Sequence, residues 1–326
     1  MLMSVILFAV GLVLLIKGGD WFVDGATGIA KRFNLPDIVV GATVVSIGTT
    51  LPEVMVSTTG ALQGSGAMAY GNAIGSIICN TALIAAISIT CNPGPVNVKS
   101  MKTPAIFFFC SAAIYCLAAY GLGTFPRWLG FVMLTIFVIY MVMTVRNGLK
   151  NPDAVAEEED EEGDGKEKGL GQLLVLLVVG AAVIAVGANL LVEHGQIIAL
   201  GLGVPETVVA LLFVALGTSL PELVTTITSL KKGRASLGVG NVIGANVFNL
   251  VLVSGVAVSL APFDVPVENT LLNTGLNLSL VFDIPVMLGV MSLMIFPALA
   301  TKKLHRWQGI LLLCIYAAFC VCQFIL

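Results

Sequence analysis

A six-residue pattern, Gly-Thr-Thr/Ser-Leu-Pro-Glu, occurs twice in this chain, from Gly48 to Glu53 and again from Gly217 to Glu222. Both copies lie inside apolar stretches, where a glutamate costs on the order of 3 kcal/mol to hold at membrane depth. In each copy a proline precedes the glutamate, and proline cannot complete the helical hydrogen-bond ladder. The pattern therefore predicts two broken, charged helices in two related halves of a membrane protein, with an ion site between them.

The composition also indicates a membrane protein, because 57% of the residues are hydrophobic and 11% are charged, against roughly 25% charged residues in soluble domains. Apolar runs of about 18 residues or more, enough to cross a bilayer as a helix, recur along the whole chain. We place them at about 3–29, 37–61, 68–91, 104–122, 127–146, 169–193, 205–230, 237–261, 281–299 and 307–325. The first run lacks the basic start and the cleavage site of a signal peptide, so we expect it to span the membrane.

The basic residues predict the orientation of these spans. All Lys and Arg residues except Lys17 and Arg127 fall in the loops after the first, third, fifth, seventh and ninth spans. Positively charged loops stay in the cytoplasm, so we expect both termini outside the cell. The stretch 147–168 is rich in Glu and Asp, which is typical of a solvated, disordered segment. We interpret it as an acidic cytoplasmic linker rather than a calcium-sensing element.

A constant shift of 169 residues, the separation between Glu53 and Glu222, brings the two halves of the chain into register without a gap. The shift aligns glycines, prolines and asparagines, which apolar bias alone would not match. Because each half holds five spans, an odd number, the second half must enter the membrane in the opposite orientation. The predicted fold is an all-α integral membrane protein of ten transmembrane helices in two inverted-topology five-helix repeats.

The domain boundaries follow from this alignment. We expect the first repeat at 1–146, with its motif at 41–80, and the second repeat at 169–326, with its motif at 210–249. The linker 147–168 joins them.

Each repeat offers oxygen ligands that suit a hard cation. Pro52 and Pro221 each free the carbonyl group of the residue four positions earlier. Thr49 and Thr218 each precede a glutamate by four residues, so hydroxyl and carboxylate share one helix face. Two carboxylates with hydroxyl, carbonyl and amide oxygens suit Ca²⁺ or Na⁺, and the sequence has no Cys or His cluster for a softer metal. Two ionised glutamates balance one Ca²⁺ or two monovalent ions, which is a physical basis for exchange.

Two further pairs of polar residues leave alternatives open. Asn72 and Asn241 are either amides that pack helices together or direct ligands. Asp20 and Asp24 share a helix face and either line a hydrated cation vestibule or form the polar end of a tilted helix.

The paired motifs, each followed by Gly-Asn-x-Ile-Gly and then an asparagine, resemble the two alpha-repeats of the sodium/calcium exchanger family in the calcium/cation antiporter superfamily. The resemblance covers both repeats, the ten-helix plan and the acidic linker. It implies a secondary antiporter that exchanges Ca²⁺ for Na⁺ by alternating access, with the first helix of each half sliding across the core. The site that it implies consists of Thr49, Glu53, Thr218 and Glu222 around Ca²⁺; Ser46, Thr50, Ser76, Ala215 and Ser219 at flanking sodium sites; and Asn80 and Asn249 completing the centre.

The chain departs from the family pattern at several positions, among them Ile77, which replaces the Asn that the second repeat keeps as Asn246. Many members carry Asp where this chain has Asn249, and in the potassium-dependent branch that Asp matters for potassium, so we expect a potassium-independent exchanger. Ala245 stands where symmetry with Ser76 predicts a hydroxyl, which weakens one sodium site. A Ca²⁺/H⁺ exchanger on the same scaffold therefore remains the alternative.

Other functional classes fit the sequence less well. An ATP-driven pump is disfavoured because the chain has no Gly-x-x-x-x-Gly-Lys-Ser/Thr loop. A hydrolase with paired carboxylates would need a metal or a partner of raised pKa, and two inverted halves favour a transporter over a passive channel. We expect a monomer that is not an enzyme, needs no cofactor, binds no nucleic acid, and has Ca²⁺, Na⁺ and membrane lipid as its partners.

Overall fold

Long helices make up almost all of the protein in the computed structural model, which describes residues 2–150, 168–202, 217–266 and 277–325. The first half comprises α1 (Leu2–Arg32), α2 (Asp37–Val40), η1 (Gly41–Val45), α3 (Ser46–Leu62), α4 (Gly66–Cys79), η2 (Asn80–Ala85), α5 (Ala86–Cys91), β1 (Gly94–Pro95), α6 (Val98–Cys116), η3 (Leu117–Leu122), β2 (Thr124–Phe125) and α7 (Arg127–Leu149). The second half comprises α9 (Leu170–Gly201), α11 (Leu220–Lys231), α12 (Ala235–Phe248), η4 (Asn249–Val253), α13 (Ser254–Leu260), β3 (Phe263–Asp264), η6 (Ser279–Asp283), α14 (Ile284–Thr301), β4 (Lys303–Leu304) and α15 (Arg306–Ile325). The η segments are π-helical and continue neighbouring α-helices.

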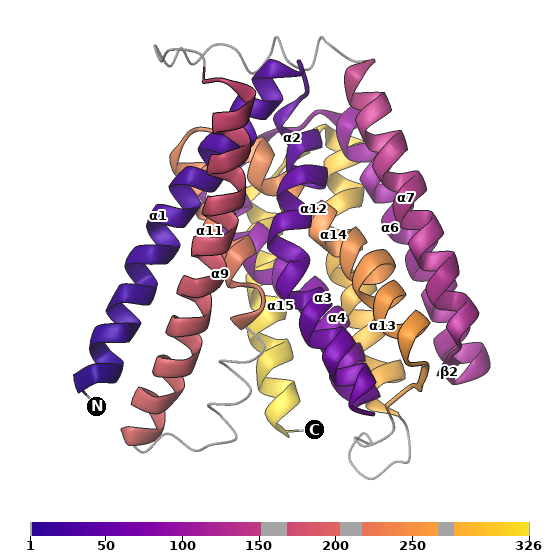
Figure 1. Cartoon of the computed structure of the whole chain (residues 1–326). Coiled ribbons are helices and arrows are strands. Elements are labelled where there is room, and N and C mark those ends of the chain that lie inside the picture. Colours follow the sequence, from indigo (N-terminus) through magenta and orange to yellow (C-terminus); the bar gives the residue numbers. More distant parts are fainter. Residues whose placement is uncertain (1, 151–167, 203–216, 267–276, 326) are drawn as a thin grey trace.

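Nine helical stretches among the described residues are long and apolar enough to cross a membrane. They correspond to nine of the ten predicted spans. The remaining span, predicted at 205–230, falls partly outside the described residues, and α11 is its described part. The two termini lie at one end of the bundle, while α7 ends and α9 begins at the other (Figure 1). Both termini lie at the same end of the bundle, as they must when the number of spans is even.

Two short strand pairs show that the halves are related by inversion. β1 pairs antiparallel with β4, and β2 pairs antiparallel with β3. Each pair joins a strand of the first half to a strand of the second. Exchanging the halves turns one pair into the other, as a two-fold axis in the membrane plane would do.

The helices that carry the two glutamates also end in the same way. Gly64 follows α3 with φ of 82°, and Gly233 follows α11 with φ of 70°. After each helix, a main-chain N–H reaches back five residues to a carbonyl oxygen at 2.8 Å, from Ser65 to Gly60 and from Arg234 to Ser229. Glycine is favoured at such a left-handed position because it has no Cβ. The predicted repeat therefore extends to the capping turns.

The expected break at the prolines is present in one half only. In the first half, α3 runs without interruption through Pro52, and the π-helical η1 lies just before α3. In the second half, Thr218 and Ser219 form a turn, and α11 begins at Leu220 with Pro221 in its first turn. A proline is tolerated there because first-turn N–H groups have no intrahelical partner. The prediction of a broken first-half helix was wrong, because Pro52 removes a single hydrogen bond and the rest of α3 continues the helical ladder past it.

Helices α1 and α9 pack closely along a seam of glycines. A Cβ added to Gly11 would lie 2.9 Å from the Gly187 carbonyl oxygen, and one added to Gly187 would lie 2.8 Å from the Gly11 carbonyl oxygen. Gly18 and Gly25 continue the seam at intervals of seven residues, against the α9 main chain. Small residues of this kind let membrane helices approach backbone to backbone. We infer that α1 and α9 form one structural unit.

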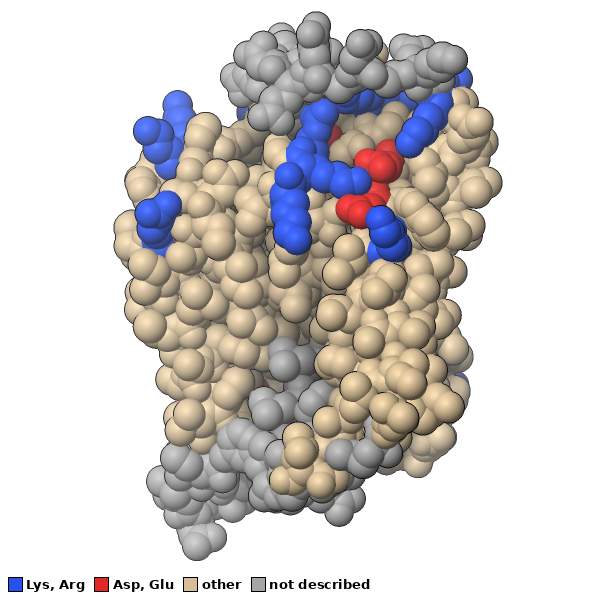
Figure 2. Space-filling model, turned by 90° about the vertical axis from the view of Figure 1, so that its left-hand side faces the viewer, with Lys and Arg blue, Asp and Glu red and all other residues tan. Residues whose placement is uncertain are grey.

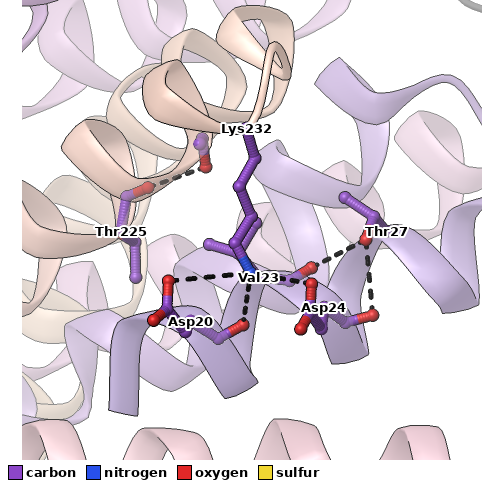
Figure 3. A network of polar contacts seen from close by, with 7 residues as sticks. Asp20, Val23, Asp24, Thr27, Thr225 and Lys232 are labelled. Carbon is purple, nitrogen blue, oxygen red and sulfur yellow. Dashed lines mark hydrogen bonds and ion pairs between the residues drawn. The ribbon is translucent and has the colours of Figure 1, made fainter. Parts of the chain in front are cut away.

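Two basic residues after α11 form ion pairs with carboxylates of α1 and α2. Lys232 Nζ lies 2.8 Å from Asp24 Oδ1 and 3.7 Å from Asp20 Oδ1, and it donates to the Asp20 carbonyl oxygen at 3.0 Å (Figure 3). Arg234 Nη1 lies 3.4 Å from Asp37 Oδ2 at the start of α2. Of the two interpretations of Asp20 and Asp24, these contacts favour a polar helix end, because an ammonium group already neutralises charge there.

Replacing Gly187 by Leu should separate α1 from α9, since the new side chain would meet the α1 main chain. Overpacking of this kind costs about 1–3 kcal/mol, so the melting temperature of the detergent-purified protein should fall. Gly289→Leu is the matched control, because Gly289 lies within α14 and a Cβ there meets no described atom within 4 Å. Equal melting temperatures for the two variants would contradict the glycine seam.

Candidate ion-binding site

The two motif glutamates lie buried in the middle of the bundle. Glu53 on α3 and Glu222 in the first turn of α11 both have 0% of their surface exposed. The helices that carry them, α3 and α11, pack against each other. The N-terminus of α11 favours a negative charge at Glu222. Two carboxylates so placed repel each other unless a cation or protons neutralise them.

Hydroxyl groups from the opposite half lie beside Glu222. Thr49 and Thr50 on α3 are buried, and their hydroxyls lie next to the Glu222 carboxyl group. Thr49 nevertheless donates its proton elsewhere, to Asn241 Oδ1 at 3.2 Å. This hydrogen bond leaves the lone pairs of the Thr49 oxygen available to a cation beside Glu222. A cation between the two oxygens would bind to both.

Asn80 and Asn249 occupy the same place in the two halves, each as the first residue of a π-helical segment. Asn80 begins η2 after α4, and Asn249 begins η4 after α12. Both are fully buried. Segment η4 packs against α3 and η2 packs against α11, so each asparagine segment contacts the glutamate helix of the other half. Short π-helical stretches of this kind often mark functional sites.

The site is rich in buried polar atoms that have no hydrogen-bond partner among the described residues. They are both carboxyl oxygens of Glu53 and Glu222, both side-chain amide atoms of Asn80 and Asn249, and the hydroxyl oxygens of Thr50 and Ser219. An unsatisfied buried group costs about 1–3 kcal/mol. Most of these atoms are oxygens, and a cation among them would satisfy the oxygens together.

The remaining predicted ligands lie around this centre in different environments. Ser76 is buried on α4, one turn before Asn80. Ser46, the first residue of α3, has its hydroxyl oxygen 2.8 Å from the Gly41 carbonyl oxygen and 2.9 Å from that of Asn241, so its proton is already engaged. Thr218 is half-buried and donates to Asn72 Oδ1 at 3.3 Å. Ala215 lies outside the described residues.

Asn72 and Asn241 join neighbouring helices through their amides, as the first of the two interpretations expected, and they do so across the boundary between the halves. Each accepts a hydrogen bond from a threonine that the motif marks as a ligand. The sequence did align the two asparagines under the repeat shift, but it gave no sign that each would contact the opposite half.

The donor set favours a hard cation. Within the described ranges, no three His, Cys, Asp or Glu residues come together in a group that could hold a metal. The other ligands of a cation bound by the two glutamates must therefore be neutral oxygens. Carboxylate, hydroxyl and amide oxygens are the ligands that Ca²⁺ accepts.

Known proteins resemble this chain over nearly its full length. The family model for sodium/calcium exchanger protein matches residues 3–146 and 172–325, on either side of the linker. An uncharacterized membrane protein of Methanocaldococcus jannaschii is 34% identical over 309 residues, covering 95% of this chain and 94% of that protein. The sodium/calcium exchanger MaX1 of Methanosarcina acetivorans is 29% identical over 98% of both chains.

The fold has been seen in a solved structure. The sodium-calcium exchanger NCX_Mj, soaked with Na⁺ and Sr²⁺, matches with a TM-score of 0.79 at 32% identity, over 97% of each chain. The chain therefore belongs to the sodium/calcium exchanger family of integral membrane transporters, and it is not an enzyme.

Proposed function

We propose that this protein is a secondary antiporter that moves Ca²⁺ against Na⁺ by alternating access, without requiring K⁺. The observation that carries the proposal is the buried pair Glu53 and Glu222, whose four carboxyl oxygens have no hydrogen-bond partner among the described residues. One Ca²⁺ or two Na⁺ ions neutralise this pair equally well, so the two ions compete for one site. Competition of this kind couples their transport.

The proposed ligands come from both halves of the chain. Glu53 and Thr49 contribute from α3, and Glu222 and Thr218 from α11 and the turn before it. Ser46, the hydroxyls of Thr50, Ser76 and Ser219, the backbone carbonyl group of Ala215, and the amides of Asn80 and Asn249 complete the proposed set. Because a single chain supplies every ligand, we also propose that a monomer is sufficient for transport.

Independence from K⁺ rests on Asn249. This residue is fully buried and neutral, so the site has two carboxylates rather than three. Adding K⁺ to a site already neutralised by Ca²⁺ would leave an uncompensated positive charge in a low-dielectric interior, which is costly.

Transport by the purified protein in liposomes tests this proposal. Vesicles loaded with Na⁺ and diluted into Na⁺-free buffer should take up ⁴⁵Ca²⁺, and equal K⁺ on both sides should leave the rate unchanged. Vesicles with a pH gradient and no Na⁺ should take up none. Uptake driven only by the pH gradient would instead identify a Ca²⁺/H⁺ exchanger, and dependence on K⁺ would contradict the role given to Asn249.

Neutralising either glutamate should abolish exchange. Glu53→Gln and Glu222→Gln keep the size of the side chain but remove a charge that Ca²⁺ needs, so we expect Na⁺-driven ⁴⁵Ca²⁺ uptake to fall to the level of empty liposomes. Asp283→Asn is the matched control, because Asp283 is an intramembrane carboxylate that pairs with Gln323 (2.7 Å) outside the proposed site. Near-normal uptake by either glutamine variant would exclude that glutamate from the site.

We propose further that both termini face the outside of the cell. The face in Figure 2 gathers its lysine and arginine side chains near the end of the bundle where α7 ends and α9 begins in Figure 1. Positively charged ends of membrane proteins remain in the cytoplasm. The opposite end carries the termini.

Reporter fusions in a bacterial host test this orientation. Alkaline phosphatase, which is active only outside the cytoplasm, should be active when fused after residue 326. Green fluorescent protein, which fluoresces only inside, should be bright when inserted in the linker 147–168. The reverse pattern would place the basic end of the bundle outside.

A further inference from the structure

Asn72 and Asn241 occupy equivalent positions on the two helices that follow the glutamate helices, Asn72 on α4 and Asn241 on α12. Asn241 is fully buried and Asn72 is half-buried. Neither belongs to the ligand set proposed above. Their hydrogen bonds nevertheless all lead to that set or to the helices that hold it.

The side-chain oxygen of each asparagine accepts a proton from the threonine of the opposite half. Thr49 Oγ1 donates to Asn241 Oδ1 at 3.2 Å, and Thr218 Oγ1 donates to Asn72 Oδ1 at 3.3 Å. These two hydrogen bonds cross the boundary between the halves in opposite directions. They are therefore equivalent under the inversion that relates the halves.

The side-chain nitrogen of each asparagine points toward the glutamate of its own half. Asn72 Nδ2 donates to the Glu53 carbonyl oxygen at 3.1 Å and to Ser57 Oγ at 2.8 Å. Asn241 Nδ2 donates to Thr225 Oγ1 at 2.9 Å, and the Thr225 hydroxyl lies 2.9 Å from the Pro221 carbonyl oxygen and 3.0 Å from that of Glu222. Each asparagine thus links the backbone of one glutamate to the hydroxyl of the opposite threonine.

These contacts fix where each threonine proton points. A hydroxyl has one proton and two lone pairs. When the proton goes to an asparagine oxygen, both lone pairs are left for a cation. The Asn72 amide is held in this orientation because a flip would place its oxygen against the Glu53 carbonyl oxygen, which can only accept.

We propose that Asn72 and Asn241 are positioning residues that direct the protons of Thr218 and Thr49 away from the ion, so that both hydroxyl oxygens are preset as Ca²⁺ ligands. The inference rests on the proposed Ca²⁺ site. It assigns the asparagines an indirect effect on affinity, exerted by each through the threonine of the other half. Preset ligands bind more tightly because less ordering remains to be done on binding.

A double-mutant cycle on Asn72 separates this role from ordinary packing. Asn72→Leu has nearly the same shape and should raise the half-saturating Ca²⁺ concentration about fivefold, the effect expected from one lost hydrogen bond. Thr218→Val should raise it by at least as much. In the double variant the two effects should not multiply, because without the Thr218 hydroxyl there is no proton left to direct.

The chain supplies its own control in the other threonine. Asn72→Leu combined with Thr49→Val should show multiplied effects, since Thr49 donates to Asn241 and not to Asn72. Thr218→Ser, which keeps the hydroxyl, should remain sensitive to Asn72→Leu. Removing Asn72 also frees Ser57 Oγ and the Glu53 carbonyl oxygen, but this loss is the same in both cycles and cancels when they are compared.

The readout is the rise in melting temperature of the detergent-purified protein as Ca²⁺ is added, which reports binding without transport. The inference is supported if the fold-changes in half-saturating Ca²⁺ concentration do not multiply when Asn72→Leu is combined with Thr218→Val. They should multiply when Asn72→Leu is combined with Thr49→Val. Multiplying effects in both cycles overturn it while leaving the Ca²⁺ site intact. A wild-type protein that Ca²⁺ does not stabilise overturns the proposed site itself, and the inference with it.

Discussion

Two carboxylates that share one dry interior are the constraint on which this structure depends. Glu53 and Glu222 are fully buried on two helices that pack against each other. Isolated ionised groups are expensive to bury, so the pair needs a cation or protons to neutralise it. Because that positive charge can come from one divalent or two monovalent ions, the need for neutrality in the bundle centre is also what would couple the ions in exchange.

Inversion is the means by which one chain brings these two groups together. Strand pairs β1–β4 and β2–β3 join the halves at two places, and each glutamate helix packs against the π-helical segment of the opposite half. The threonine–asparagine hydrogen bonds follow the same rule. In each of these contacts, a strand, helix or side chain of one half pairs with its partner in the other half. A half-protein would therefore have neither a neutralised carboxylate nor a positioned hydroxyl.

Sequence patterns predicted the features that depend on period and repetition. Apolar run lengths predicted nine spans that the structure describes, and the 169-residue shift predicted the inverted repeat, down to matching turns at Gly64 and Gly233. Features that depend on proximity in space could not be predicted in this way. The continuity of α3 through Pro52 depends on its packed surroundings, and the links from Asn72 and Asn241 join residues far apart in the chain. The Lys232 contacts with Asp20 and Asp24 have the same long-range character.

The most direct test of this account is to locate the ion. Crystals soaked in Sr²⁺, which scatters anomalously and stands in for Ca²⁺, should show a strong anomalous peak between Glu53 and Glu222. The peak should lie about 2.3–2.6 Å from oxygens of both halves, allowing for the slightly larger ion, with Thr49 and Thr218 among the ligands. A peak bound by only one of the two halves, or one found only beside Asp20 and Asp24, would contradict a shared central site.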